Sequence, residues 1–385
     1  MPEYMQMPRL ALFLEVSLHW GRAIAKGVFH ANRTVTGWRS VLLATDEQLN
    51  DSVFRASSQP HWVGIIGQFY PKHAAALARL HELGVPTVNV SSWEPPKSTI
   101  WIHNDDEACG ELVADFFGVR GYRNFAFAGF PETAFSIRRF HGFANALNAR
   151  GVNVLVDITP PAERRESMIE FTAPKLIELP KPCAVFACND QRARHILASA
   201  DAAGIDVPER LSIIGVDDDD LLCEISHIPL SSVRNDFHRI GEQAVKLLFT
   251  QSGKAPQGFE LKVPPIKIVE RRSSSATATD DPMIARMISY IQDNIDGDLD
   301  SDSMASFFGI SRRSLERHLV RAIGQTSRKA IQSARMRRAY ERVVGTSLSF
   351  GRIASLAGFS KQSQFNAAFK RTFNRTPGQA RKGVG

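Results

Sequence analysis

Two segments near the end of the chain carry side chains that could hydrogen-bond to the edges of DNA bases. Residues 304–319 read MASFFGISRRSLERHL, and residues 353–369 read IASLAGFSKQSQFNAAF. In a major groove, Arg and Lys suit guanine, whereas Gln and Asn suit adenine. We expect the following residues to contact DNA: Arg312, Arg313, Glu316, Arg317, Lys361, Gln362, Gln364, Asn366 and Lys370.

These two segments repeat one pattern, and each repeated residue has a structural reason. Three pairs are separated by 49 positions, namely Ala305 and Ala354, Gly309 and Gly358, and Ser311 and Ser360. The alanine lets two helices cross closely, the glycine supplies a left-handed turn, and the serine caps the second helix. Four apolar residues of the second helices face inward at i, i+4 spacing: Leu315, Leu319, Phe365 and Phe369. The pattern predicts two helix-turn-helix units.

The positive charge of the chain is concentrated in the same region. Residues 282–385 contain 18 Lys and Arg but only 7 Asp and Glu, whereas the preceding residues contain 29 and 33. A basic domain attached to a slightly acidic body is typical of nucleic-acid-binding proteins. A basic tail that only aids solubility would lack the patterned apolar residues, so we expect this region to fold.

Residues 358–370, read with Arg375-Thr376-Pro377, resemble the signature of the AraC family of regulators. Residues 335–339 resemble the helix that joins the two units in that family. One departure is Ala380, since the family usually has an aromatic residue at this position. The resemblance implies a bent seven-helix domain with both recognition helices in successive major grooves, about 34 Å apart.

The first 270 residues alternate apolar runs with amphipathic segments. Expected strands are Leu10–Val16, Val41–Ala44, Val63–Gly67, Thr87–Val90, Phe125–Gly129, Val152–Val156, Cys183–Cys188 and Leu211–Val216. Expected helices are Gly21–Asn32, His73–Leu83, Asp106–Val119, Phe135–Arg150 and Asp190–Ala203. This alternation predicts parallel sheets with right-handed crossovers, which bind ligands at the carboxyl ends of the strands.

Several phrases of this part resemble the LacI-type sensor, whose two-lobed architecture is that of periplasmic sugar-binding proteins. They are residues 187–190, 204–208, 213–218, 229–233 and 265–271. Such a sensor in front of an AraC-type domain resembles transcription factors of the xylose operon regulator type. The implied fold is a two-lobed α/β sensor with parallel sheets, followed by an all-α double helix-turn-helix domain. We therefore expect a sensor over residues 1–271, a polar linker over 272–281, and a DNA-binding domain over 282–385.

In such sensors a sugar lies between two lobes that close on it. Polar groups hold its hydroxyls, and aromatic rings cover its C–H surface. Residues that match the ligand positions of the resemblance are the polar Glu15, Asp105, Arg139, Asn189 and Asp217, with the aromatic Trp20, Phe69, Trp93 and Phe135. Glu15 is a departure, because the xylose type has an amide there. Xylose and another pentose or hexose therefore both stay open.

Several of these residues also have a purely structural interpretation. Asp105 could cap the following helix, and Arg139 could be a surface base beside Arg138. Trp20, Trp93 and Phe135 could belong to the core. The run Asp217–Asp220 is expected to form a turn and a helix start rather than a metal site.

The four cysteines, Cys109, Cys183, Cys188 and Cys223, are expected to be buried thiols in a reducing cytoplasm. Cys183 and Cys188 should lie on opposite faces of one strand and so not pair. No apolar stretch approaches 18 residues, so no membrane span is expected. The first strand is not interpreted as a signal peptide.

The expected function is a cytoplasmic, sugar-responsive regulator that binds duplex operator DNA as a homodimer and activates pentose catabolic genes, with RNA polymerase as a further partner. No cofactor, metal or catalytic residue is expected. One alternative is the same architecture with a different sugar or sugar derivative. Another is a carbohydrate-processing enzyme using two of Asp105, Asp217 and Asp218, although no motif supplies an acid–base pair at fixed separation. A transport protein would share the sensor fold but not the DNA-binding region.

Overall fold

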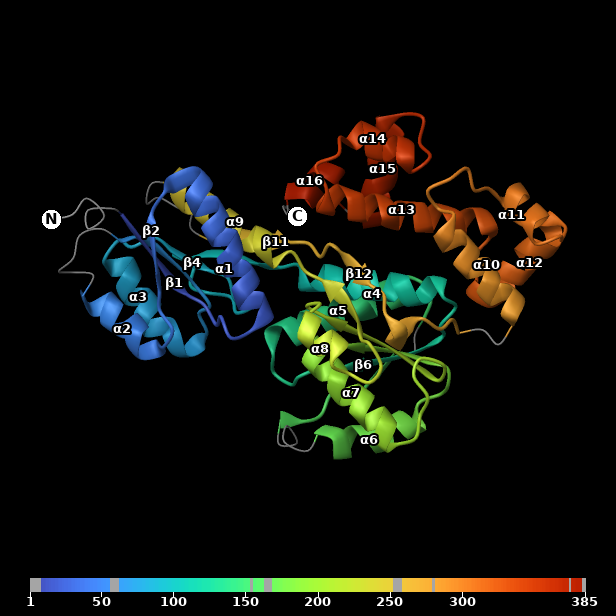
Figure 1. The fold of residues 1–385 in the computed structure, drawn as a ribbon, viewed down its shortest axis with the longest axis horizontal. Coiled ribbons are helices and arrows are strands. Elements are labelled where there is room, and N and C mark those ends of the chain that lie inside the picture. Colours follow the sequence, from blue (N-terminus) through green and yellow to red (C-terminus); the bar gives the residue numbers. More distant parts are fainter. Residues whose placement is uncertain are drawn as a thin grey trace. The chain divides into compact units, whose positions relative to one another are not determined.

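The computed structural model describes residues 8–55, 62–152, 155–162, 168–251, 258–278, 281–373 and 375–382. These residues form two compact units (Figure 1). Among them, unit 1 contains residues 8–105 and 236–263, and unit 2 contains residues 106–235 and 264–382. No helix in the described part is long and apolar enough to cross a membrane.

Unit 1 is built on a six-stranded parallel sheet with the order β11-β5-β4-β3-β1-β2. Its strands are β1 Arg9–Phe13, β2 Arg39–Leu42, β3 Trp62–Gly67, β4 Thr87–Asn89, β5 Ile100–Asn104 and β11 Glu260–Val263. Successive side chains point to opposite faces. Leu10 and Leu12 therefore pack with α1 (His19–Ala31) and α9 (Phe237–Gln251), and Ala11 packs on the other face with α2 (Asp46–Arg55) and α3 (Ala74–Glu82).

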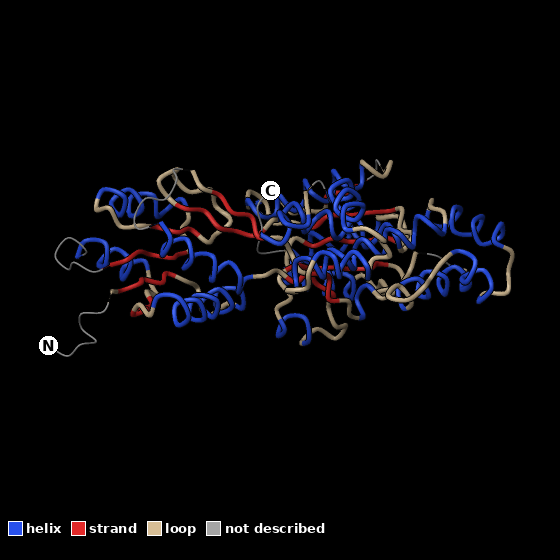
Figure 2. The backbone as a smooth tube through the Cα atoms, turned by 90° about the horizontal axis from the view of Figure 1, so that it is seen from above, coloured by secondary structure: helices blue, strands red, loops and turns tan. Residues whose placement is uncertain are grey.

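Unit 2 contains a second six-stranded sheet with the order β12-β10-β9-β8-β6-β7. Its strands are β6 Asn124–Ala128, β7 Leu155–Asp157, β8 Cys183–Ala187, β9 Leu211–Val216, β10 Ser231–Arg234 and β12 Lys267–Val269. Helices cover both faces. They are α4 Asp106–Val119 and α5 Ala134–Asn148 on one face, and α6 Met168–Glu178 and α7 Asp190–Ala202 on the other. Figure 1 labels α4 and α5 on one side of β6 and α7 and α6 on the other, and Figure 2 draws the strands in red and the helices in blue. Only β12 among the described strands is antiparallel.

The positions of Cys183 and Cys188 on opposite faces of the sheet confirm the alternation of side chains expected along β8. Cys183 lies in the cluster beneath α7, whereas Cys188 lies in the cluster beneath α4 and α5. All four cysteines are buried thiols that form no disulfide with one another. Burial raises the pKa of Cys183 and of Cys188 to about 12, so neither thiol is ionised near neutral pH.

Each sheet carries one pair of helices that pack backbone against backbone. A Cβ atom on Gly27 of α1 would lie 1.9 Å from a carbonyl oxygen of α9, and one on Gly241 of α9 would lie 2.1 Å from a carbonyl oxygen of α1. In unit 2, the corresponding distances to α5 and α4 are 2.3 Å for Gly110 and 2.0 Å for Gly142. Only glycine fits at these four positions.

The expected α/β elements are present, with shifts at their ends. Leu211–Val216 and Asp106–Val119 have the predicted bounds. The expected strand Leu10–Val16 is too long, because the chain turns after Phe13. The sequence patterns missed four strands, namely β5, β10, β11 and β12. Residues 153 and 154 of one expected strand lie outside the described residues.

The helical end of the chain consists of seven helices within the described residues 281–382, which confirms the expected number. They are α10 Pro282–Asp293, α11 Ser301–Phe307, α12 Arg312–Ile323, α13 Ser327–Gly345, α14 Phe350–Leu356, α15 Gln362–Phe373 and α16 Pro377–Lys382. Two hydrophobic clusters share α13, because Ala334 packs in the first and Met336 in the second. Asp281 caps α10 by accepting the Met283 N–H at 2.9 Å.

The residues expected to form a linker begin with a packed turn. The 3-10 turn Arg272–Ser274 contains two fully buried serines, Ser273 and Ser274. The Ala278 N–H then donates to the Arg120 carbonyl oxygen at 3.0 Å. Residues 279–280 lie outside the described residues.

Candidate ligand-binding and nucleic-acid-binding sites

In each sheet, the strand order reverses between two neighbouring strands, β1 and β3 in unit 1 and β6 and β8 in unit 2. Parallel α/β sheets bind ligands outside the carboxyl ends of the strands at such a point. The polar residues expected from the sequence lie at these edges. Glu15 follows β1, Asn189 follows β8, and Asp217 follows β9.

The edge of unit 1 encloses a cavity of about 130 Å³. Its polar lining consists of Glu15, Asp46, Gln68, Tyr70, Lys72 and His73. The Glu15 carboxylate is exposed and accepts a hydrogen bond from Ser17 Oγ at 2.5 Å. The cavity therefore offers both acceptors and donors to a polar ligand.

Gln68 is a cavity residue that the sequence reasoning missed. Its side chain is 3% exposed, and Oε1 accepts the Glu15 N–H at 2.6 Å. Its Nε2 is buried and has no hydrogen-bond partner among the described residues. An unpaired buried donor costs roughly 1–3 kcal/mol, which a ligand hydroxyl could recover. The signal was its place directly after the apolar run Val63–Gly67.

The charged groups of this cavity compensate one another. The Lys72 ammonium lies 2.6 Å from Asp46 Oδ2, and it lowers the pKa of Asp46 together with His73. His73 Nδ1 accepts the Tyr70 N–H at 3.0 Å, so the ring proton sits on Nε2, 3.1 Å from Asp46 Oδ1. Burial, with Glu15 nearby, raises the pKa of Tyr70. No cation of this group is left without a carboxylate.

The other expected residues of unit 1 differ in their exposure. Phe69 is fully buried in the core and stacks on Phe13, with 5.8 Å between the ring centres, so it presents no face to a ligand. Trp20 and Trp93 are half-buried at the edges of hydrophobic clusters. Asp105 is 4% exposed and is the last residue before the chain enters unit 2.

The edge of unit 2 is organised around Arg139, which is buried and is not a surface base. Its Nε donates to Asp106 Oδ1 at 2.9 Å, and its Nη2 lies 3.5 Å from Asp217 Oδ1. Its Nη1 donates to the Cys188 carbonyl oxygen at 2.5 Å, and the guanidinium covers the Phe135 ring at 4.9 Å. Burial alone would lower the pKa of Arg139, but Asp106 and Asp217 raise it above its ordinary value. Arg139 therefore contacts Phe135, Asp217 and Cys188, which directly precedes Asn189.

Asp217 has a backbone conformation that is rare for a residue with a side chain. Its φ is 111°, and that of Asp218 is 50°. Such conformations cost about 1–3 kcal/mol each and are found at functional sites. Asn235, which the sequence reasoning missed, donates from Nδ2 to Asp217 Oδ1 at 3.2 Å. Asn189 caps α7 by accepting the Arg192 N–H at 2.9 Å.

The run Asp217–Asp220 forms the expected turn and helix start. Asp219 caps α8 (Asp220–Glu224) by accepting the Leu221 N–H at 3.1 Å. Across the described residues, no group of three or more His, Cys, Asp or Glu side chains is placed to hold a metal ion.

The first helix-turn-helix unit consists of α11 and α12. Gly309 has a φ of 65° in the turn, and Ser311 caps α12 by accepting the Ser314 N–H at 3.2 Å. Leu315 and Leu319 are fully buried. Three of the expected DNA-contacting residues are exposed on this helix: Arg312, Arg313 and Arg317.

Glu316 is a correction to the expected DNA surface. Its Oε2 accepts the Ser327 N–H at 2.8 Å, and its Oε1 accepts Ser327 Oγ at 2.6 Å. The carboxylate thereby fixes the start of α13 against α12. This residue holds the unit together and is not available to a base.

The second unit consists of α14 and α15, with Gly358 at a φ of 80° in its turn. The expected cap is wrong here, because α15 begins at Gln362 and Ser360 Oγ donates to Gln364 Oε1 at 3.3 Å. Phe365 and Phe369 are fully buried as expected. Four expected contact residues are exposed: Lys361, Gln362, Gln364 and Lys370. Asn366 is half-buried, with Oδ1 lacking a partner among the described residues.

The fold and the two sets of side chains define a class of protein. An α/β sensor of the periplasmic-binding-protein type precedes a pair of helix-turn-helix units, which is the organisation of a ligand-controlled transcription regulator. Residues 114–274 match the family of periplasmic binding protein-like domains, and residues 304–383 match a helix-turn-helix domain family.

Known proteins that are similar along most of the chain agree with this class. The xylose operon regulatory protein of Escherichia coli (strain K12) is 29% identical over 329 residues, which cover 83% of each chain. The corresponding protein of Haemophilus influenzae is 26% identical over 73% of this chain and 74% of its own. The structure of a xylose-binding transcription activator superposes with a TM-score of 0.59 over 99% of this chain and 100% of that one, at 24% identity. The chain is similar to the xylose operon regulatory proteins over most of its length, and its matched domains are those of a sugar-sensing transcription regulator rather than of an enzyme.

Proposed function

We propose that the chain is a transcription regulator controlled by a neutral sugar. The observation that carries the proposal is the set of polar side chains at the switch-point edges of both sheets, centred on the buried Arg139 and on Asp217. Sugar binding at these strand ends changes how the helix-turn-helix units sit on operator DNA. The sensor then extends over residues 1–271 and the DNA-binding domain over 282–385, joined by residues 272–281.

The charge balance supports a neutral effector. Asp106 and Asp217 offset the charge of Arg139, and Asp46 offsets that of Lys72. A phosphate or carboxylate would meet no free cation among these residues, and it would be repelled by Glu15. Hydroxyl groups instead suit the amide Nε2 of Gln68 and the carboxylate of Asp217. The names of the relatives favour D-xylose, and another pentose or a hexose is the alternative.

The exposed side chains of α12 and α15 support binding to two major grooves. Base contacts fall to Arg312, Arg313, Arg317, Lys361, Gln362, Gln364 and Asn366, with Lys370 on the phosphate backbone. The regulator acts in the cytoplasm as a homodimer, activates pentose catabolic genes and contacts RNA polymerase. The activator role follows the similar fold of a xylose-binding transcription activator, and the other assignments are part of the proposal.

The experiment that tests the sugar is the thermal stability of the full chain with D-xylose, L-arabinose, D-ribose, D-glucose and D-galactose. A ligand at a hundred times its Kd stabilises the folded state by about 2.7 kcal/mol. We expect one sugar to raise Tm, and Asp217→Ala to remove the rise. The control is Asp220→Ala, which removes the same charge from an exposed neighbour. The proposal fails if no sugar shifts Tm, or if Asp217→Ala responds like the wild type.

A further inference from the structure

The loop of residues 217–219, at the end of β9, is held by hydrogen bonds to all three of its backbone N–H groups. Asp217 N–H donates to the Val233 carbonyl at 2.9 Å, Asp218 N–H to Ser232 Oγ at 2.9 Å, and Asp219 N–H to Asp190 Oδ2 at 2.9 Å. Ser232 Oγ in turn donates to Asp190 Oδ1 at 2.5 Å. The surroundings therefore fix the two positive φ angles of this loop.

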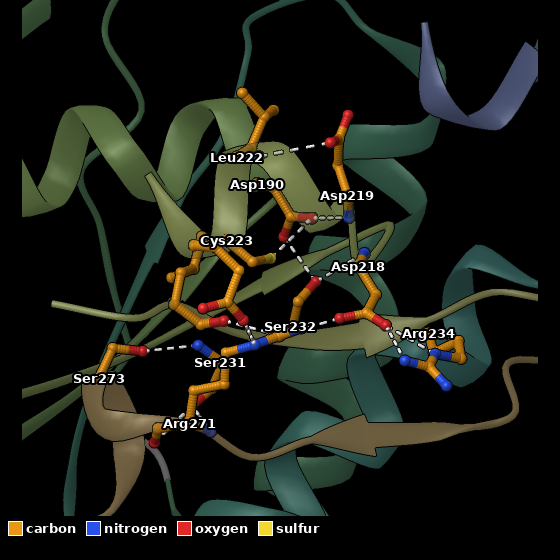
Figure 3. A network of polar contacts seen from close by, with 12 residues as sticks. Asp190, Asp218, Asp219, Leu222, Cys223, Ser231, Ser232, Arg234, Arg271 and Ser273 are labelled. Carbon is orange, nitrogen blue, oxygen red and sulfur yellow. Dashed lines mark hydrogen bonds and ion pairs between the residues drawn. The ribbon is translucent and has the colours of Figure 1, made fainter. Parts of the chain in front are cut away.

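The side chain of Asp218 forms ion pairs with two arginines, Arg234 and Arg271 (Figure 3). Its Oδ2 accepts Arg234 Nε at 2.6 Å, and its Oδ1 accepts Arg271 Nη1 at 2.8 Å. The Asp218 side chain is 2% exposed, that of Arg271 is 13% exposed, and that of Arg234 is 42% exposed. The buried contact is therefore the one with Arg271.

Arg271 also anchors the segment that leads to the DNA-binding domain. Its Nε donates to Glu224 Oε1 at 3.0 Å, and its Nη1 also donates to the Leu230 carbonyl at 3.0 Å. Its backbone N–H and carbonyl oxygen both bond to Ser231 Oγ, at 2.7 and 2.9 Å. One residue thus connects the Asp218 loop, α8 and β10.

Directly after Arg271, side-chain hydrogen bonds hold the chain against the sheet of unit 2. Ser273 Oγ donates to the Ile213 carbonyl of β9 at 2.7 Å and accepts the Ser231 N–H at 2.9 Å. Ser274 Oγ donates to Ser231 Oγ at 2.8 Å. A displacement of the loop 217–219 therefore has a contiguous hydrogen-bonded route to residues 271–274.

We propose that Arg271 is a positioning residue that transmits the state of the Asp217 site to the segment preceding α10. A ligand changes an equilibrium only through contacts that differ between two states, and on this proposal the Asp218–Arg271 contact, next to Asp217, is one that differs. This inference rests on the proposed function in taking Asp217 as an effector contact. Its test does not require the effector to be known.

The test is a mutant cycle on the full chain, read by hydrogen–deuterium exchange of the amides of residues 271–278. Asp217→Ala perturbs the site in the absence of any sugar. We expect it to speed exchange at Ser273 and Ser274 roughly three- to tenfold in the wild type and in the control Arg272→Ala, whose side chain is exposed. In Arg271→Ala, where the contact is already lost, Asp217→Ala should add less than twofold.

A second comparison separates the contact from the charge. Arg234→Ala removes a positive charge that pairs with Asp218 but leaves Arg271 in place. The effect of Asp217→Ala on exchange should therefore persist in the Arg234→Ala background. If Arg271→Ala does not fold, Arg271→Lys serves instead, because an ammonium cannot bond to Asp218 and Glu224 with the arginine geometry. Circular dichroism checks folding in every variant.

The proposal is overturned if Asp217→Ala leaves exchange at residues 271–278 unchanged. It is also overturned if the effects of Asp217→Ala and Arg271→Ala multiply. The same measurement with D-xylose, L-arabinose, D-ribose, D-glucose and D-galactose tests the proposed function separately. Absence of protection at residues 217–219 with every sugar would reject the sugar effector, while the mutant cycle still decides the role of Arg271.

Discussion

The buried carboxylate of Asp106 in unit 2 pairs with two arginines that differ in solvent exposure. The Asp106 side chain is 1% exposed and bonds to both Arg138 and Arg139. Removing one partner of a buried ion pair is far more damaging than removing an exposed one, because a charge is left without compensation. The side-chain exposures of 21% for Arg138 and 4% for Arg139 therefore predict different consequences.

We expect Arg139→Met to lower the free energy of unfolding by about 3 kcal/mol, since two carboxylates lose their shared cation. Arg138→Met should lower it by less than about 1 kcal/mol, because the lost pair is partly exposed. Urea denaturation of the two variants measures both values. Equal losses would show that Asp106 does not depend on the buried partner.

Asp190 predicts a dependence of stability on pH. Burial, followed by the charge of Asp217, raises the pKa of this carboxyl well above its usual range. Protonated Asp190 therefore contributes to the free energy of unfolding. This contribution is fully present below the ordinary pKa of an aspartate, near 3.8, and is lost as pH rises through the raised pKa of Asp190. An asparagine at this position cannot ionise. The free energy of unfolding of the wild type, measured relative to that of Asp190→Asn, should therefore fall as pH rises above about 4.

Urea midpoints of the two proteins between pH 4 and pH 8 measure this difference. A constant difference across that range would contradict the prediction. Asp220→Asn provides the matched control, since Asp220 is exposed.

The sequence could place site residues that directly follow a strand, whereas it could not predict contacts between distant segments. Asp217 and Asn189 could be placed because they directly follow long apolar strands. Asn235 could not, because its only relation to Asp217 is a contact across 18 positions of sequence. Phe69 illustrates the opposite error: an aromatic residue at a strand end fits both a ligand and a core, and its burial depends on Phe13 and its other neighbours.

At the scale of elements, the missed strands β5 and β10 carry buried polar groups whose partners lie in distant segments. Ser231 and Ser232 of β10 are fully buried, and their hydroxyls bond to Arg271 and Asp190. In β5, His103 is 2% exposed and its Nε2 lies 2.9 Å from Glu260 of β11. These partners come from distant segments, so no local pattern could reveal them.

The two recognition helices start differently, which gives an element-scale prediction. Ser311→Ala should lower the free energy of unfolding by about 1 kcal/mol, because it removes the cap of α12. Ser360→Ala should be nearly neutral, because its hydroxyl bonds only to the exposed Gln364 side chain. Thermal unfolding of both variants tests this contrast. Similar losses would mean that Ser360 caps α15 after all.

For the whole molecule, the separation of charge along the chain predicts how DNA binding responds to substitution. Residues 282–385 hold 18 of the 47 Lys and Arg residues but 7 of the 40 Asp and Glu residues. Binding that releases counterions weakens steeply with salt. The affinity of the full chain for a mixed-sequence duplex should therefore fall as salt increases.

Charge reversal then locates the contact surface. Arg313→Glu and Lys361→Glu should each weaken DNA binding at least tenfold, because each replaces an attraction to phosphate or base with a repulsion. Arg33→Glu makes the same change in charge on an exposed residue of unit 1 and should have little effect. Fluorescence anisotropy at one salt concentration compares the three. An equal loss with Arg33→Glu would point to net charge alone.

The glycines of the α1–α9 and α4–α5 pairs bear on how this sensor could acquire a new specificity. At Gly27, Gly110, Gly142 and Gly241, any side chain would collide with the backbone of the facing helix. Residues that line the cavity, such as Glu15 and Gln68, meet no such constraint. A library that varies the cavity and keeps the four glycines invariant should thus retain folded proteins, whereas random mutagenesis would repeatedly lose them at these crossings. The helix crossings of the sensor therefore tolerate no substitution of these glycines, whereas the residues that line the cavity can vary without such collisions.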